Sequence, residues 1–509
     1  MPAHGHGERL SPVDASFLQL ESAHAHMHVA WSAIFAPAAG AGTRAPDVEE
    51  IRRRVTARLG WVPRCRQRLL PAPLGIGEPR WVDDERFDVA AHVVQLTDPA
   101  DAIGPERFAQ LRDAVLSQPL DRSRPLWQLA FVPRLADGRL AVVGRVHHAM
   151  ADGAAALQIA LLTIDIEGHD DEANAGAATW QAAAPPTTLE RALDPLVHGA
   201  ELCSGAARDV ARAVSRPRAA ASEALRDAGR LVHALSQDLL PHAPASGLNR
   251  PLGPRRTLVQ HRLALDEVRA ISRGVPGTRN DVGLAVIAGA LRALAVERGR
   301  PPEPLKAMVP VNMRRAHDAA TLGNIVSMTS VWLPLQLASP AERLDVIRRQ
   351  TVRFKDSARP HGAQTLIGGF GLLPNALRAP VLRAVAPGRF NLTISSVPGP
   401  PTALSMHGMR LDELYPVIPI ADDQTLSIGM LPYEGHLYFG LYADPDGLPE
   451  ATRLAALIDE ELRALRRSPS LAPASRPPLP VVAPVAAGPL GTYENRSAVL
   501  TAAGREGVV

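Results

Sequence analysis

Hydrophobic and polar positions repeat with two different periods along the chain. Ile51, Val55 and Leu59 are spaced for one face of a helix over Asp47–Leu59, whereas His28 to Ala36 alternates as a strand does. The first part of the chain therefore predicts a mixture of helices and strands. The other elements expected there are a helix over Glu106–Leu116, a hairpin of Leu129–Val132 and Leu140–Val146 around the turn Ala136–Gly138, and a helix from Asp152 to about Ile166.

Periodicity then fades and returns. Residues 167–188 are rich in Ala, Asp, Pro and Thr, as in a linker, and Leu189–Leu240 is Ala-rich with helical spacing. A second mixed region begins near Thr257. Its expected elements are a helix over Asn280–Glu297 and strands over Ala307–Val311, Ile325–Leu333, Phe390–Ser395, Thr425–Leu431 and His436–Tyr442. We predict an N-terminal domain over residues 1–180, a helical crossover over 181–255, a C-terminal domain over 256–466, and a disordered Pro/Ala-rich tail over 467–509.

Composition narrows the class of protein. Of the 509 residues, 46% are hydrophobic, 21% charged and 4% aromatic, which is typical of a globular protein. The net charge of +3 is too weak to favour nucleic-acid binding. The sequence shows no signal peptide, and no apolar run reaches the roughly 18 residues that span a bilayer. We expect a cytoplasmic protein that meets a membrane, if at all, from its surface. Cys65 and Cys203 are expected to be two free thiols, with one disulfide as the alternative.

The most informative segment is Val146–Gly153, which follows an apolar strand and precedes the expected helix. Successive strand residues face opposite sides, so His147 and His148 cannot both line one cavity if the strand continues through them. One imidazole can take a proton from a substrate hydroxyl, because its ordinary pKa is near working pH. Asp152 would fix the local geometry through a salt bridge, and Gly153 would allow a tight turn. The alternatives are a purely structural histidine pair and a metal site, for which no third ligand follows at zinc-like spacing.

Other chemistries lack their signatures. The chain has no G-x-S-x-G elbow of a serine hydrolase and no G-x-x-x-x-G-K-[ST] phosphate loop. Gly75 and Gly77 are followed by Arg80 where a dinucleotide-binding loop needs a third glycine. These absences leave the histidine segment as the best candidate for an active site.

A series of segments, together with the His-His-x-x-x-Asp-Gly motif, resembles the bacterial wax ester synthase/diacylglycerol acyltransferase family. The motif alone is shared with chloramphenicol acetyltransferases, carnitine acyltransferases and peptide-synthetase condensation domains. The resemblance extends over roughly residues 10 to 465. In order, the other matching segments are Leu10–Asp14 with Phe17, Leu18 and Glu21; Met27–Val29; Trp81 with Phe87, Asp88 and His92; Pro119–Trp127; Asn280–Val282; Val309–Arg314 with Gly323 and Asn324; and Asn391–Pro400.

The resemblance implies an α+β fold of two chloramphenicol-acetyltransferase-like domains, each a mixed sheet with helices, and an active-site channel at their interface. It implies transfer of a fatty acyl group from acyl-CoA to diacylglycerol, a long-chain alcohol, or both. His148 would be the general base in a direct attack, and Asp152 would be structural. The implied partners are acyl-CoA, used as a co-substrate rather than a cofactor, the lipid acceptor, and a membrane or lipid-droplet surface.

Four further residues are candidates for substrate binding, each beside a structural alternative. Asn280 and Asp281 begin the expected helix, where they could instead serve as a cap and as a charge suited to the helix dipole. Arg122 and Arg124 could face a pantetheine or phosphate group, or belong to a solvated turn between Pro119 and Pro125. The residues leave these alternatives open.

Two competing functions remain. A condensation-type enzyme would keep the same base but take its acyl group from a carrier-protein thioester. A catalytically silent lipid-binding protein would need neither His148 nor Asp152. The Arg-rich helical segment between Ala206 and Arg230 could lie on an anionic membrane or simply join the two domains.

Overall fold

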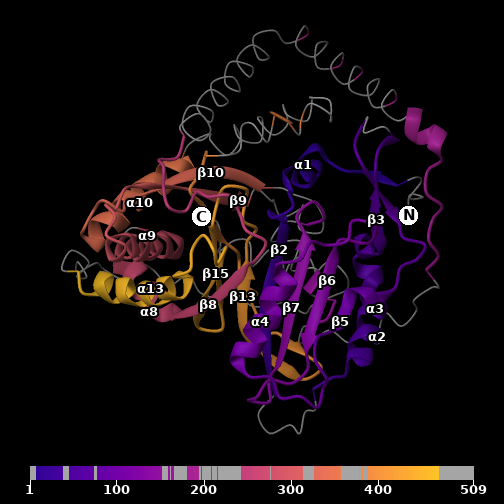
Figure 1. Ribbon diagram of the computed structural model, residues 1–509, viewed down its shortest axis with the longest axis horizontal. Coiled ribbons are helices and arrows are strands. Elements are labelled where there is room, and N and C mark those ends of the chain that lie inside the picture. Colours follow the sequence, from indigo (N-terminus) through magenta and orange to yellow (C-terminus); the bar gives the residue numbers. More distant parts are fainter. Residues whose placement is uncertain are drawn as a thin grey trace.

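The computed structural model contains two large sheets side by side, each with its own helices (Figure 1). It describes residues 7–37, 45–73, 77–151, 159–160, 162–165, 180–193, 242–274, 277–312, 326–356, 380–381 and 388–468, and the single residues 197, 204, 208, 215 and 378. The predicted helices after Asp152 and over Leu189–Leu240, and the predicted tail, fall mostly outside these residues.

The first large sheet has the strand order β12-β13-β2-β7-β6-β5, with only β5 and β6 parallel. Its strands are β2 (His28–Pro37), β5 (Val93–Gln95), β6 (Trp127–Val132), β7 (Leu140–His147), β12 (Ser405–Met406) and β13 (Met409–Val417). A small sheet, β1-β4-β3, lies beside it and is made of β1 (Glu8–Arg9), β4 (Arg80–Asp83) and β3 (Gln67–Leu70). The predicted strand over His28–Ala36 and the predicted hairpin are confirmed.

The second large sheet has the order β10-β9-β11-β14-β15-β8, in which β11 runs parallel to both neighbours. Its strands are β8 (Thr257–Ala264), β9 (Leu305–Asn312), β10 (Val326–Leu333), β11 (Leu392–Ser396), β14 (Leu426–Tyr433) and β15 (His436–Ala443). Every strand predicted for this half is confirmed to within two residues at each end.

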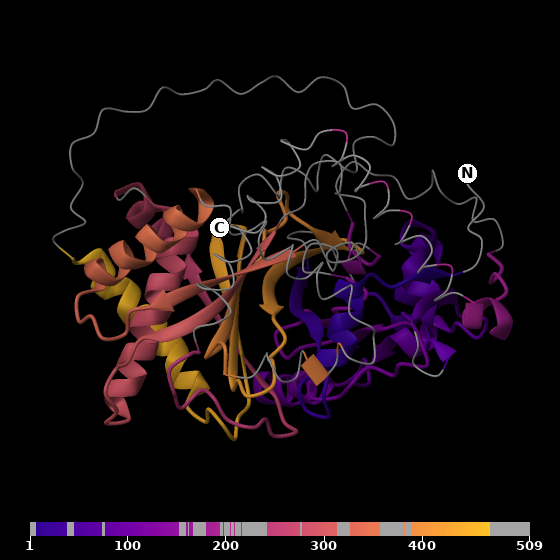
Figure 2. The same ribbon diagram turned by 90° about the horizontal axis from the view of Figure 1, so that it is seen from above.

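Helices accompany each sheet. Those of the second half lie together on one side of its sheet, as Figures 1 and 2 show. They are α8 (Leu265–Gly274), α9 (Arg279–Glu297), α10 (Pro340–Asp356) and α13 (Ala451–Arg466). The first half has α1 (Pro12–Leu20), α2 (Val48–Arg58), α3 (Val89–His92) and α4 (Pro105–Leu116), with short 3₁₀ turns over Leu59–Trp61 and Pro63–Arg66.

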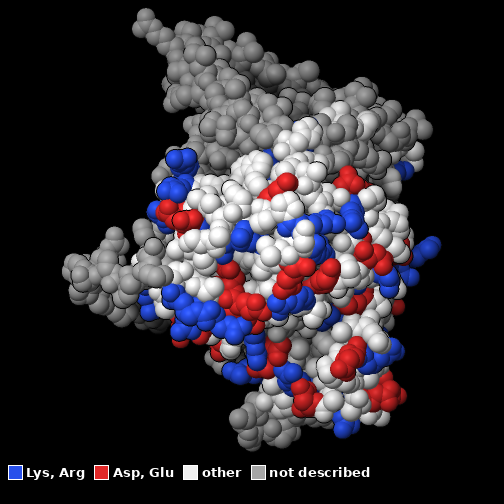
Figure 3. Space-filling model, turned by 60° about the vertical axis from the view of Figure 1, so that its left-hand side comes forward, with Lys and Arg blue, Asp and Glu red and all other residues white. Residues whose placement is uncertain are grey.

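Local sequence explains where these helices begin. Asp47 caps α2 in a reciprocal capping box with Glu50, and Pro105 stands in the first turn of α4. Helix α9 is buried along most of its length because it is apolar on nearly every side. On the face in Figure 3, basic and acidic side chains are interspersed.

Strand β13 joins the two halves. It comes late in the chain but pairs along β2 in the first sheet, from Met409 opposite Pro37 to Val417 opposite Ala30. Its Pro416 lies so close to β15 that a methyl group added at Gly440 would be 1.8 Å from the Pro416 carbonyl oxygen. The halves therefore meet at a tightly packed contact.

A shared core and polar contacts reinforce this junction. Leu258, Val417 and Tyr442 of the second half pack in one apolar cluster with side chains of β2, β6 and β7. Tyr442 donates a hydrogen bond to the Leu116 carbonyl, 2.9 Å away, and Arg112 donates to the Leu258 carbonyl at 2.6 Å. Cys65 is a buried free thiol, and Cys203 lies outside the described residues.

Candidate active site

The two histidines stand where β7 ends. All eight residues of β7 are buried, and its last residue, His147, pairs with His28, the first residue of β2. The chain turns at once, because the N–H of Met150 donates to the His147 carbonyl, 2.8 Å away. His148 is therefore the first residue outside the strand, and its N–H donates to the Met27 carbonyl at 2.7 Å.

His147 is buried, and one of its ring nitrogens is hydrogen-bonded within the fold. Its Nδ1 accepts the N–H of Ala149 at 3.0 Å, so the ring proton must be on Nε2. That nitrogen lies 3.5 Å from Oε2 of Glu21. Burial lowers the pKa of His147 despite the nearby carboxylate, which favours the neutral ring. His147 is therefore arranged as a hydrogen-bond donor and cannot accept a second proton without breaking its bond to Ala149.

His148 differs from its neighbour in burial and in contacts. It is only partly buried, and its ring stacks on that of Phe17, with 3.9 Å between the ring centroids and 7° between the planes. Helix α1 supplies Phe17 and is capped by Ser11, whose side chain accepts the Asp14 N–H. The turn after His147 thus separates the pair, with one ring packed inside and the other more open.

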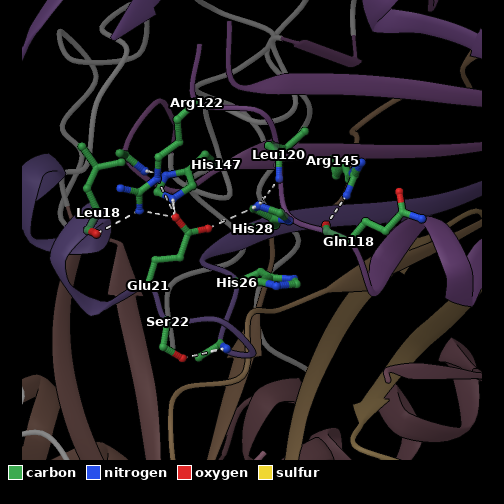
Figure 4. Close-up of polar contacts among 12 residues, drawn as sticks. Leu18, Glu21, Ser22, His26, His28, Gln118, Leu120, Arg122, Arg145 and His147 are labelled. Carbon is green, nitrogen blue, oxygen red and sulfur yellow. Dashed lines mark hydrogen bonds and ion pairs between the residues drawn. The ribbon is translucent and has the colours of Figure 1, made fainter. Parts of the chain in front are cut away.

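Glu21 is the centre of a polar cluster that includes His147, Arg122 and His28 (Figure 4). Its carboxylate accepts a 2.9 Å hydrogen bond from Nε of Arg122 and lies 3.8 Å from Nε2 of His28. Burial acts to raise the pKa of Glu21, but His147 and Arg122 outweigh it and leave the pKa lowered. The carboxylate is therefore ionised at neutral pH and compensates the Arg122 guanidinium.

The segment between α4 and β6 surrounds this cluster. The Leu120 N–H donates to His28 at 3.4 Å, Arg122 contacts Glu21, and the Leu126 carbonyl accepts the His147 N–H at 2.9 Å. Burial is the largest factor that lowers the pKa of His28, with nearby cations adding to it. The segment that the sequence analysis offered as a turn with two candidate arginines is thus in contact with both buried histidines.

The two candidate arginines have different surroundings. Arg122 is half-exposed, pairs with Glu21 and also donates to the Leu18 carbonyl at 3.0 Å. Arg124 is exposed and lies 3.5 Å from Asp121 within the same turn. Substrate binding by either residue stays a prediction. Asp152 and Gly153 lie outside the described residues.

The Asn280–Asp281 pair lies at the start of α9, in the second half, and its members are placed differently. The N-cap is Thr278 rather than Asn280, and the helix begins at Arg279, one residue before its expected start. Asp281 completes the capping box and also accepts the Thr351 hydroxyl at 2.6 Å. The amide oxygen and nitrogen of Asn280 are both buried, with no hydrogen-bond partner among the described residues. Geometry thus gives Asp281 a structural task, while ligand binding by Asn280 stays a prediction.

Sequence reasoning missed Phe17, Glu21 and His28 as site residues. Each is part of a segment that matched the family, and this match was the signal that could have singled them out. Their contacts to His147 and His148 connect residues more than a hundred positions apart, which periodicity cannot reveal. Within the described residues, no group of three or more His, Cys, Asp or Glu side chains is placed to hold a metal ion.

Comparison with solved structures defines the class of fold. The chain matches a wax ester synthase/diacylglycerol acyltransferase from Marinobacter aquaeolei VT8 with a TM-score of 0.60 and 24% identity, covering 90% of this chain and 98% of that one. It also matches the starter condensation domain of the rhizomide synthetase RzmA with a TM-score of 0.56 and 15% identity, over 91% and 95% of the two chains. These matches show an α+β fold of two domains, as predicted.

Sequence comparison identifies the family. The model of the wax ester synthase/diacylglycerol acyltransferase catalytic domain matches residues 10–283, and that of the family's C-terminal domain matches residues 322–466. Two Mycobacterium tuberculosis proteins, each described as a probable diacylglycerol O-acyltransferase, are similar. The first, tgs1, is 31% identical over 90% of this chain and 95% of its own length; the second, tgs2, is 32% identical over 90% and 99%. The chain belongs to the wax ester synthase/diacylglycerol acyltransferase family and is an acyltransferase.

Proposed function

We propose that this enzyme transfers a fatty acyl group from acyl-CoA to diacylglycerol or a long-chain alcohol, with His148 as general base. The observation that carries the assignment is the state of His147. Its Nδ1 already accepts the Ala149 N–H and its Nε2 lies inside the fold, 3.5 Å from Glu21, so His147 is poorly placed to take a substrate proton and His148 is the better candidate. The partial exposure of His148 supports the same choice.

The reaction follows from one imidazole near the acceptor. As the alcohol oxygen attacks the thioester carbon, the imidazole of His148 takes the hydroxyl proton. The tetrahedral intermediate then collapses, the carbon–sulfur bond breaks, and the CoA sulfur receives that proton from the imidazolium. The products are an ester and CoA with a free thiol, and the base is regenerated. No acyl-enzyme is needed, because the base activates the acceptor itself.

Measurement of CoA release with oleoyl-CoA and either dioleoylglycerol or hexadecanol tests this function. His148→Ala should lower kcat by at least about 100-fold, the low end for loss of a general base. Thermal unfolding should show that the variant is folded, and His242→Ala, at an exposed histidine, is the matched control. Retained turnover in His148→Ala would show that His148 is not the general base. Lipid binding without CoA release would instead favour a silent lipid-binding protein.

The acceptor class and the carrier of the acyl group are separate parts of the proposal. The mycobacterial relatives support diacylglycerol, whereas the likeness to a condensation domain extends only to the fold. A panel of diacylglycerol, hexadecanol and a carrier-protein thioester would rank these substrates directly. Asp152 remains a proposed structural residue, so Asp152→Asn should lower thermal stability together with activity.

We also propose that the enzyme works at a lipid surface. Among the described residues, no helix combines the length and apolar character needed to cross a bilayer. Residues 188–193 and residue 197 are helical, and Leu189, Leu193 and Val197 repeat every fourth position with 68%, 47% and 52% of their side chains exposed. A spacing of four puts Leu189 and Leu193, which lie in the same described helical stretch, on one face, and exposed apolar side chains of this kind suit the edge of a lipid phase.

Flotation with vesicles that contain dioleoylglycerol tests this surface. The triple variant Leu189→Gln, Leu193→Gln, Val197→Gln should bind vesicles less while keeping turnover on detergent-dispersed acceptor. The control is Val296→Gln and Val352→Gln, which also change exposed apolar side chains but lie in the helices of the second half. Equal binding by wild type and triple variant would show that this face is not the contact. Location in the cytoplasm stays a prediction.

A further inference from the structure

Glu21 links helix α1 to the turn that carries the candidate base. It follows the last residue of α1, and its own N–H donates to the Phe17 carbonyl at 3.2 Å. Its carboxylate meets the Nε2 proton of His147, the residue directly before His148. The same helix contacts His148 through the Phe17 ring. Helix α1 and the residue that follows it therefore contact both histidines: Phe17 stacks on the ring of His148, and the Glu21 carboxylate lies beside His147.

The contacts converge on Glu21 from two sides. Arg122 donates to its carboxylate, His147 Nε2 lies 3.5 Å from it at ion-pair distance, and Nδ1 of His147 accepts the Ala149 N–H. That last N–H belongs to the residue directly after His148, so the bond fixes the backbone on the far side of the base. With the His148 N–H held by Met27, the backbone is fixed both at His148 and at the residue that follows it.

We propose that Glu21 is a positioning residue for acyl transfer: acting through His147, it holds the 147–150 turn against α1 so that the His148 imidazole keeps one orientation. The inference rests on the proposed role of His148. It assigns Arg122 to Glu21 rather than to a phosphate of CoA, because the guanidinium already has the carboxylate and the Leu18 carbonyl as acceptors.

Steady-state kinetics of Glu21→Gln is the main test. Gln has nearly the same shape but leaves the Arg122 charge uncompensated and no longer draws the His147 proton. We expect kcat to fall by between about 10-fold and 100-fold, as for a slightly misplaced catalytic group, with KM for both substrates within about twofold. The matched control is Glu461→Gln, because Glu461 is equally buried (11% exposed, against 10% for Glu21) and pairs with Arg343 in the other half. It should lower the melting temperature without lowering kcat.

A second pair of variants tests the route through His147. His147→Asn keeps an acceptor for the Ala149 N–H but cannot reach Glu21. If Glu21 acts through His147, the double variant should be no slower than the slower single variant. Independent, multiplying losses would overturn this route.

Arg122→Gln keeps the inference falsifiable if Glu21→Gln does not fold. A positioning role predicts a lower kcat with unchanged KM for acyl-CoA, whereas direct contact with CoA predicts a raised KM. Unchanged kcat in a folded Glu21→Gln enzyme, or a raised KM alone in Arg122→Gln, would overturn the inference. A fully active His148→Ala enzyme would instead contradict the proposed role of His148 itself, so failure of the proposed function can be told apart from failure of the inference about Glu21.

Discussion

The rings of Phe17 and His148 lie face to face, 3.9 Å between centroids and 7° from parallel. This contact fixes the plane of the imidazole, because a flat apolar surface leaves the ring one tilt that keeps it in contact. Phe17→Leu should therefore lower kcat by roughly 10-fold through misorientation, with little change in stability. Phe17→Tyr, which keeps the ring, is the control and should retain turnover. Full activity in Phe17→Leu would show that the stacking does not orient the base.

Asp281 and Asn280 should respond differently to substitution. Asp281→Asn places an amide N–H₂ where the carboxylate accepts from Thr278 and Thr351, so we expect a loss of about 1–3 kcal/mol in the free energy of unfolding. Denaturant unfolding checks this value. Asn280→Ala removes an amide that has no hydrogen-bond partner among the described residues, so stability should hold while KM for one substrate rises. Reversed outcomes would exchange the two assignments.

Stability should fall in mild acid because His28 and His147 are buried as neutral rings. Burial lowers both pKa values from the ordinary 6.5, although Glu21 opposes this at His147. The unfolded chain then binds protons that the folded chain does not, so the free energy of unfolding decreases as pH falls below 6.5 and keeps decreasing to the folded pKa. The slope is about 1.4 kcal/mol per pH unit for each histidine.

Chemical denaturation between pH 5 and pH 8 measures this slope. His28→Gln should reduce the slope by about 1.4 kcal/mol per pH unit, the contribution of one histidine. Glutamine can still accept the Leu120 N–H but does not titrate. His24→Gln, at an exposed position, is the control. An unchanged slope in His28→Gln would mean that this ring titrates alike in both states.

Gly440 should not tolerate a side chain. An added methyl group would lie 1.8 Å from the carbonyl oxygen of Pro416, and backbone cannot move aside as a flexible side chain can. Gly440→Ala should cost at least about 3 kcal/mol, the upper end for overpacking. Gly60→Ala is the control, since nothing lies within 4 Å of an added methyl group there. Comparable melting temperatures of the two variants would contradict the tight contact between the halves.

Most strands and several helices could be predicted from local periodicity, but β13 could not. Its alternation is broken by a register shift between Leu411 and Glu413, and Pro416 is unusual within a strand. Its partner, β2, is almost four hundred positions earlier, so no local signal connects them. Helix α13 was also not predicted, although Leu454, Leu457 and Ile458 repeat at helical spacing.

Only part of the candidate site could be predicted, because local patterns reveal neighbouring residues and not contacts between distant ones. One histidine of the pair was expected to pack while the other lines a site, and the structure shows one buried and one more open ring, although a turn after His147 rather than continued strand alternation separates them. Glu21 and Phe17, in contrast, reach the pair from a helix more than 120 positions upstream. Local patterns specify which way neighbours point; only the folded chain brings distant carboxylates and rings to them.

The late arrival of β13 constrains how the protein can be made. As the chain leaves the ribosome, β2 has its partner β7 after about 150 residues but must wait until residue 417 for β13. Until then one edge of the histidine-bearing sheet presents unpaired backbone groups, a state that invites association with other chains. A gene fragment that ends before residue 242 should therefore yield insoluble product. Co-expression of residues 242–468 should restore solubility, because that piece supplies β13.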